Sequence, residues 1–223
     1  MNILNIGVDN KYFGQSRPEM LEFIPKDTKN ILEFGCSNGL FGQSVKDMLK
    51  VSYWGVEINK NAAIEATKVL DKVINTDIND SWELLPLHSF DCIVFNDVLE
   101  HLIDPYSVLN KCKDYLSDSG VVVTSIPNVR FIDNLINLII YKHWQYTSSG
   151  ILDITHLRFF TKRSIIEMFN TLGYDVKIKG INMSVMTFKI RIFHLLTLNY
   201  FEDTRFLQFA CVASPRKNSK LQY

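Results

Sequence analysis

The stretch of this chain best suited to chemistry is a glycine-bearing turn that follows an apolar segment. Residues 31–39 read Ile-Leu-Glu-Phe-Gly-Cys-Ser-Asn-Gly, and a helix-like spacing of apolar residues follows them. Glycine lets bare backbone approach a ligand, and the N-terminus of a following helix presents unpaired N–H groups. Because ligands of open α/β sheets bind at the carboxyl ends of strands, the turn from Gly35 to Gly39 predicts a small-molecule site.

The turn does not fit a dinucleotide well. A nicotinamide dinucleotide site needs three glycines, and counting from Gly35 the second and third positions hold Ser37 and Leu40. Glu33 lies just before the turn, where a carboxylate repels a pyrophosphate but attracts an ammonium or sulfonium group. A ligand without phosphates is therefore favoured, and a nicotinamide-dependent oxidoreductase is the less favoured alternative.

Two further acidic residues indicate a nucleoside. Glu57 ends the next apolar segment about 20 residues later, where a carboxylate can accept two hydrogen bonds from ribose hydroxyls. Asp77 ends the third segment and can accept a hydrogen bond from the exocyclic amine of adenine, with Ile78 against the ring. Together with the glycine turn, these residues predict a site for an adenosine that lacks phosphates.

Alternating strands and helices must position these residues. Continuous apolar strands joined by short connections that carry helices indicate a parallel sheet covered on both faces. A helix should begin after Asp104, whose side chain can cap it, with Pro105 at its first position. The expected strands are Asn30–Phe34, Ser52–Glu57, Lys72–Thr76, Phe90–Phe95 and Gly120–Ile126, and the other early helices are Leu40–Lys50 and Asn61–Leu70.

The pattern changes after Pro127. We expect one domain over residues 1–223, with residues 128–160 as a helical insertion and loop that covers the substrate at the carboxyl end of the sheet. Thr161 should cap a helix that stops at Gly173. The remaining expected elements are an antiparallel pair of strands at the sheet edge, Tyr174–Gly180 and Arg205–Ala213, and a helix over Ser184–Leu198.

The order and spacing of these segments resemble class I S-adenosylmethionine-dependent methyltransferases. The segments that carry the likeness are residues 32–39, 55–58, 76–78 and 90–102, supported by 120–128 and 153–161. The resemblance implies a Rossmann-like, seven-stranded, mostly parallel sheet of order 3-2-1-4-5-7-6 with helices on both faces. It also implies S-adenosylmethionine as cofactor and S-adenosylhomocysteine as product.

The resemblance assigns roles to residues. The turn would hold the methionine part of the cofactor, Glu57 the ribose and Asp77 the adenine, while Asn96 and Asp97 would face the methionine and the reacting methyl. Ser37 departs from the family, which usually has glycine there. The full set of cofactor-binding candidates is Glu33, Gly35, Cys36, Ser37, Asn38, Gly39, Glu57, Ile58, Asp77, Ile78, Asn96 and Asp97.

A hydroxyl acceptor must lose its proton during methyl transfer, and histidine is the side chain best suited to take it. His156 and His101 are the catalytic candidates, although either ring can instead be structural. Glu100 could be catalytic, but a structural carboxylate that binds backbone amides is the favoured interpretation. Among the other histidines, His88 is assigned to a surface loop, His143 to the insertion, where it could touch substrate, and His194 to a structural role.

The segment around His156 is similar to small-molecule O-methyltransferases and to methyltransferases of surface-polysaccharide pathways. It implies a small-molecule or sugar-containing acceptor. The alternatives are N-methylation of a small-molecule amine and a non-catalytic cofactor-binding module. Trp144 and Tyr146 could stack on a ring or sugar, although core packing is the favoured alternative. Tyr12, Phe13 or Arg17 could close over the methionine end of the cofactor, or could belong to a plain surface helix.

Composition excludes other classes. The chain has 24 Lys and Arg against 24 Asp and Glu, so no general affinity for nucleic acid is expected. Its cysteines, Cys36, Cys92, Cys112 and Cys211, show no zinc spacing, which predicts no metal site and a reduced, cytoplasmic compartment. The apolar run Leu135–Tyr141 is too short to span a membrane. It could form a lid, a dimer face or a contact with a membrane surface.

Overall fold

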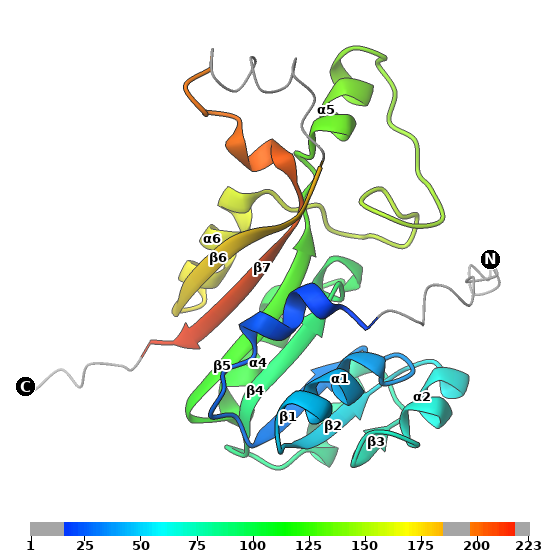
Figure 1. Ribbon diagram of the computed structural model, residues 1–223, viewed down its shortest axis with the longest axis vertical. Coiled ribbons are helices and arrows are strands. Elements are labelled where there is room, and N and C mark those ends of the chain that lie inside the picture. Colours follow the sequence, from blue (N-terminus) through cyan, green and yellow to red (C-terminus); the bar gives the residue numbers. More distant parts are fainter. Residues whose placement is uncertain (1–15, 185–196, 217–223) are drawn as a thin grey trace, which may run out of the picture.

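Seven strands form one sheet in the order β3-β2-β1-β4-β5-β7-β6 (Figure 1). The computed structural model describes residues 16–184 and 197–216. Neighbouring strands from β3 to β5 pair in parallel, whereas β7 is antiparallel to both β5 and β6. The strands are β1 Asn30–Phe34, β2 Ser52–Val56, β3 Lys72–Ile74, β4 Phe90–Asn96, β5 Leu116–Pro127, β6 Tyr174–Met183 and β7 Phe206–Pro215. The expected order and the edge hairpin are confirmed.

Helices cover both faces of the sheet. The 3₁₀ helix Pro18–Phe23, α1 (Leu40–Met48) and α2 (Lys60–Ala66) pack on one face. The other face carries α3 (Ile78–Ser81), α4 (Pro105–Tyr115) and α6 (Lys162–Thr171). Successive residues of β4 alternate between the two cores, and this explains its unbroken apolar sequence. The remaining helical segments are Trp82–Leu84, Leu99–His101, α5 Ile132–Ile139 and Glu202–Arg205.

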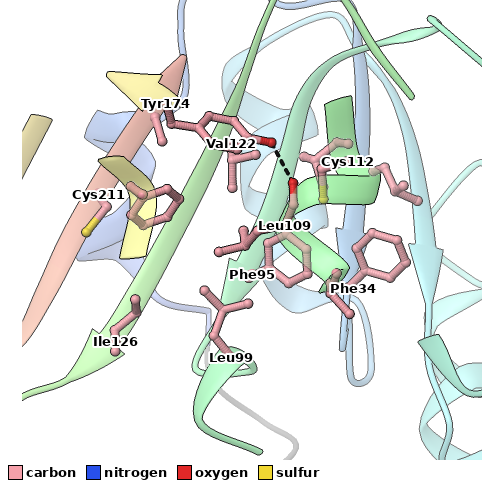
Figure 2. Close-up of a cluster of buried hydrophobic side chains, with 14 of the residues drawn as sticks. Phe34, Phe95, Leu99, Leu109, Cys112, Val122, Ile126, Tyr174 and Cys211 are labelled. Carbon is pink, nitrogen blue, oxygen red and sulfur yellow. Dashed lines mark hydrogen bonds between the residues drawn. The ribbon is translucent and has the colours of Figure 1, made fainter. Parts of the chain in front are cut away.

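The larger core holds the central strands in place (Figure 2). The rings of Phe34 and Phe95 stack with their centroids 5.2 Å apart, which joins β1 to β4 close to their carboxyl ends. The buried Tyr174 hydroxyl donates a hydrogen bond of 2.7 Å to the backbone oxygen of Leu109, so β6 is tied to α4. Cys36, Cys92, Cys112 and Cys211 are free thiols, all buried as core residues.

Several element boundaries differ from expectation. The strand β5 begins at Leu116, four residues before the expected start, because it pairs with β4 on both sides of an irregularity between Phe90 and Cys92. Residues Ser117 to Ser119 are polar, so the apolar pattern in the sequence did not indicate this part of the strand. The short helix α3 after Asp77 was also missed. The helix expected at Ser184–Leu198 lies almost wholly outside the described residues, as do Tyr12, Phe13 and His194.

Residues 128–160 contain one helix, α5, and otherwise irregular chain. Figure 1 shows α5 beyond the carboxyl end of β5, with the irregular chain looping back from it. Ile139, Ile140 and Tyr141 are each at least 66% exposed. In the part of the chain that the structure describes, no helix combines the length and the apolar character needed to cross a membrane.

Candidate active site

The glycine turn connects β1 to α1 in a left-handed backbone conformation. Gly35 has φ +68°, and a Cβ there would lie 2.7 Å from Cγ2 of Val98, so only glycine fits without a shift. Its N–H donates to the backbone oxygen of Val56 at 2.8 Å. Cys36 is buried against Gly55, and so it can offer only its backbone to a ligand, while Asn38 is half-buried and Gly39 caps α1.

Glu57 fixes the turn at the position where the sequence departs from the family. Ser37 has φ +51°, an unfavourable angle for a residue with a side chain, and its N–H donates to Oε2 of Glu57 at 2.8 Å. The other carboxylate oxygen accepts from the N–H of Asn59 at 2.7 Å. Burial raises the pKa of Glu57, and these backbone donors oppose the rise. Each oxygen retains a further lone pair for a ligand hydroxyl.

Glu33 lies beneath the turn rather than at its surface. Its side chain is 2% exposed and accepts hydrogen bonds of 3.0 Å from the Tyr53 hydroxyl and from Nδ2 of Asn96. Burial raises the pKa of Glu33 to about 7. Within the described residues, Oδ1 of Asn96 is buried and has no hydrogen-bond partner, so the tip of β4 carries an unsatisfied acceptor.

Asp77 caps α3, and its Oδ1 accepts from the backbone N–H of Asn79 at 2.8 Å. The two apolar candidates beside the acidic residues lie differently. Ile78 is 9% exposed and belongs to the core, whereas Ile58 is 68% exposed beside Glu57. Of these two side chains, Ile58 is the one accessible to a ligand ring.

Asp97 is held by side chains that the sequence did not connect with it. Its carboxylate pairs with the Arg17 guanidinium, accepts from Nε2 of Gln208 at 2.7 and 2.8 Å, and accepts from the Ser125 hydroxyl at 2.7 Å. Arg17 also donates to the Ser125 hydroxyl. Gln208 lies on β7, more than a hundred residues away in sequence, and no motif marks it.

His101 and His156 come together with Glu100 in one cluster, in which Glu100 and His156 are buried and His101 is half-buried. The ring centroids are 4.7 Å apart, and Nε2 of His156 lies 3.9 Å from Oε1 of Glu100. Burial and the neighbouring His156 lower the pKa of His101, and burial raises the pKa of Glu100 well above its ordinary value. The sequence had suggested the two histidines separately, and the fold places them side by side.

The interpretation of Glu100 as a carboxylate that binds backbone amides is wrong. The amides of Leu157 and Arg158 do donate to this residue, at 2.8 and 3.0 Å, but to its backbone oxygen. Neither carboxylate oxygen has a hydrogen-bond partner among residues 16–184 and 197–216, although the side chain is 1% exposed. The carboxylate is therefore buried without the amide donors expected for a structural role.

A hollow of about 360 Å³ lies beside this cluster, in the segment after β5. The two are joined at Ile151, which lines the hollow and whose backbone oxygen receives the hydrogen bond from Nδ1 of His156. The aromatic rings of Trp144 and Phe159 are in edge contact, with centroids 5.5 Å apart. The hollow combines polar and apolar side chains: Asp133, Asn134, Asn137, His143, Gln145 and Thr147 with Phe131, Ile151, Leu152 and Leu207.

Comparison with known proteins identifies a matching protein family. A family model described as a methyltransferase domain matches residues 9–177. The ubiquinone biosynthesis O-methyltransferase of Vibrio atlanticus is 27% identical over 152 residues, which are 67% of this chain and 62% of that protein. The chain thus spans less than two thirds of the length of this relative.

Solved structures share the fold. A SAM-dependent methyltransferase from Archaeoglobus fulgidus aligns with a TM-score of 0.68 and 21% identity, over 91% of this chain and 96% of its own. The plantazolicin methyltransferase BpumL in complex with SAH aligns with a TM-score of 0.59 and 16% identity, over 92% of this chain and 84% of its own.

Proposed function

Because the chain belongs to the methyltransferase domain family, we propose that it transfers the methyl group of S-adenosylmethionine to an oxygen of a small, hydroxyl-bearing molecule. The observation that carries this proposal is Glu57, a buried carboxylate that holds the glycine turn and keeps lone pairs for two ribose hydroxyls. No pyrophosphate-binding glycine pattern is present in the same turn.

The residues at the strand ends fit this cofactor. Asn96 supplies a buried acceptor without a partner at the tip of β4, suited to the ammonium group of the methionine part. We place the ribose on Glu57, the adenine between Asp77 and the exposed Ile58, and the methionine part along the turn and beside Asp97. Glu33 supports the site indirectly, because its carboxylate accepts a hydrogen bond from Nδ2 of Asn96 and so orients that side chain.

When bound, the cofactor supplies a methyl group on a positively charged sulfur. The chain aligns the acceptor oxygen with that methyl and excludes water, since an in-line displacement depends above all on alignment. The acceptor proton must leave as the new bond forms, and His101 and His156 are the titratable groups assigned to that end of the site. Their role as general bases stays a prediction.

The acceptor hollow supports a sugar-containing or other polyhydroxylated substrate. Amides and carboxylates such as Asn134, Asn137 and Asp133 can bind hydroxyl groups, and the apolar floor formed by Phe131 and Leu152 can cover a ring face. The oxygen specificity is supported by the Vibrio atlanticus relative, an O-methyltransferase. Residues 128–160 would then cover the substrate. The free cysteines favour a reduced, cytoplasmic compartment for the reaction.

Calorimetric titration with S-adenosylhomocysteine tests the cofactor site. Glu57→Gln should weaken binding more than about tenfold, because the amide retains only one acceptor oxygen for the ribose and the backbone. The matched control is Glu65→Gln on the exposed side of α2, which should bind as the wild type does. Wild-type affinity in Glu57→Gln would overturn the ribose assignment. A protein that binds the product and methylates amines but no hydroxyl compound would be an N-methyltransferase, and one that methylates neither would be a non-catalytic module.

A further inference from the structure

The cluster formed by Glu100, His101 and His156 combines three groups that bind metals. Their ligand atoms all lie within 4.8 Å of one another. Glu100 and His101 belong to the 3₁₀ turn Leu99–His101 after β4, and His156 comes from the irregular chain before α6. The backbone hydrogen bonds from residues 157 and 158 to the Glu100 oxygen hold the two segments together.

The Glu100 carboxylate needs a partner that the described residues do not provide. Burying a carboxylate without hydrogen bonds or a counter-charge is expensive, and so such groups are normally paired or bind a metal. Both oxygens of Glu100 lack a hydrogen bond, and His156 at 3.9 Å is beyond hydrogen-bond distance. The carboxylate therefore lies beside the two imidazoles with its lone pairs available.

Hydrogen bonds at Nδ1 of both histidine rings fix their tautomers. Nδ1 of His156 lies 2.9 Å from the Ile151 backbone oxygen, which can only accept, so Nδ1 carries the proton. Nδ1 of His101 faces the backbone oxygen and the hydroxyl of Thr155, and that hydroxyl already donates to Asp153. In the neutral form each ring thus has its lone pair on Nε2. A backbone acceptor behind the ring is the usual support of a metal-bound histidine.

We propose that Glu100, His101 and His156 form a binding site for a first-row divalent transition-metal cation. Two imidazole nitrogens and one carboxylate oxygen are a ligand set typical of Zn²⁺, Mn²⁺ and Fe²⁺, and three ligands leave coordination positions open. Ligands about 2.1 Å from a metal lie roughly 3–4 Å apart. The distance of 3.9 Å between His156 and Glu100 is already in that range. Cysteine spacing did not indicate this site, because its ligands are a glutamate and two histidines, and His156 is distant from the other two in sequence.

The position of the site gives the cation a role that rests on the proposed function. The cluster adjoins the acceptor hollow through Ile151 and follows β4 directly after the residues assigned to the methionine part. A hydroxyl oxygen in an open coordination position would be held in place, and its pKa would fall. Its proton could then leave to water, and the two histidines would serve as ligands rather than as general bases.

Metal binding can be measured on the purified full chain after treatment with a chelator. Titration with Mn²⁺, followed by electron paramagnetic resonance, should show one saturable site. The bound ion should also show electron spin echo modulation from imidazole nitrogen. Glu100→Gln and His156→Ala should each weaken Mn²⁺ binding more than about tenfold, because each removes one of three protein ligands. Zn²⁺ should displace bound Mn²⁺.

The matched control is His88→Asn, which removes an exposed histidine that precedes β4, whereas the cluster follows the carboxyl end of this strand; it should change Mn²⁺ affinity by less than about twofold. If Glu100→Gln does not fold, His101→Asn is measured in its place. Absence of saturable binding for Mn²⁺ and Zn²⁺, absence of nitrogen modulation, or wild-type affinity in the ligand variants would overturn the proposal. Titration with S-adenosylhomocysteine in metal-free buffer separates this result from a failure of the cofactor assignment.

Discussion

At the scale of single residues, the candidate site depends on buried carboxylates with different partners. The Glu33 carboxylate accepts hydrogen bonds from the side chains of Tyr53 and Asn96. The Glu57 carboxylate instead accepts from the backbone N–H groups of Ser37 and Asn59. Backbone donors stabilise the ionised form of Glu57, while neutral side-chain donors compensate the burial of Glu33 only in part. The two residues are therefore suited to different tasks, Glu57 to binding and Glu33 to support.

Glu33 should make stability depend on pH. Its ordinary pKa of 4.5 rises to about 7 in the folded chain. As pH rises between these values, the unfolded chain ionises first, so the free energy of unfolding falls and the loss is complete above pH 7. Glu33→Gln should remove this pH-dependent fall in the free energy of unfolding, which amounts to about 3 kcal/mol. Urea unfolding at pH 5 and pH 8 measures it.

The glutamine in this variant can keep both hydrogen bonds, because Asn96 can turn its unpartnered Oδ1 toward the new amide group. Asp71→Asn is the control, because the pKa of Asp71 is lowered and this carboxyl is ionised in the folded and the unfolded chain at both pH 5 and pH 8. This variant should therefore keep the pH dependence of the wild type. Equal pH dependence in wild type and Glu33→Gln would show that Glu33 does not titrate in this range.

At the scale of elements, helix caps fix where the segments that carry the site begin. Asp104 accepts from the N–H of Ser107, and Thr161 accepts from the N–H of Ser164, whose hydroxyl in turn accepts from the N–H of Thr161. Both caps follow segments with site residues, and Thr161 comes five residues after His156. The start of α6 thus limits how far the preceding irregular chain can move.

Thr161→Ala should lower the free energy of unfolding by about 1 kcal/mol, because the first turn of α6 loses its capping acceptor. Thr161→Ser keeps the hydroxyl and should retain most of that stability. Chemical denaturation of the three proteins gives the comparison. Equal losses in both variants would assign the effect to the lost methyl group rather than to the cap.

At the scale of the whole molecule, one polar network joins segments from both ends of the chain. Arg17 precedes the first 3₁₀ helix, Asp97 ends β4, Ser125 lies on β5 and Gln208 on β7. The network continues through Asn182 on β6, which donates to Gln208 at 2.7 Å. The N-terminal segment is thereby attached where the parallel part of the sheet meets the antiparallel hairpin.

Arg17→Met should destabilise the fold by about 2 kcal/mol, because it leaves Asp97 half-buried without its cation. Adding Asp97→Asn to this variant should cost less than the sum of the two single changes, since the unpaired charge is then removed. Lys179→Met, which breaks the exposed pair with Glu22, should change stability by less than about 1 kcal/mol. Additive losses in the double variant would show that Arg17 and Asp97 are not coupled.

The sequence by itself determined the positions of most strands, the two caps and the turn around Gly35, whereas the order of the strands came from the resemblance to a known family. These features are local, because apolar runs, capping residues and left-handed glycines act through neighbours in the chain. Only the tertiary structure brought His156 to Glu100 and His101, joined Arg17 to Gln208 and placed Glu33 beneath Asn96. Such contacts join residues separated by tens to nearly two hundred positions, and they depend on which strands become neighbours and how deeply each side chain is buried. Spacing along the chain carries neither quantity.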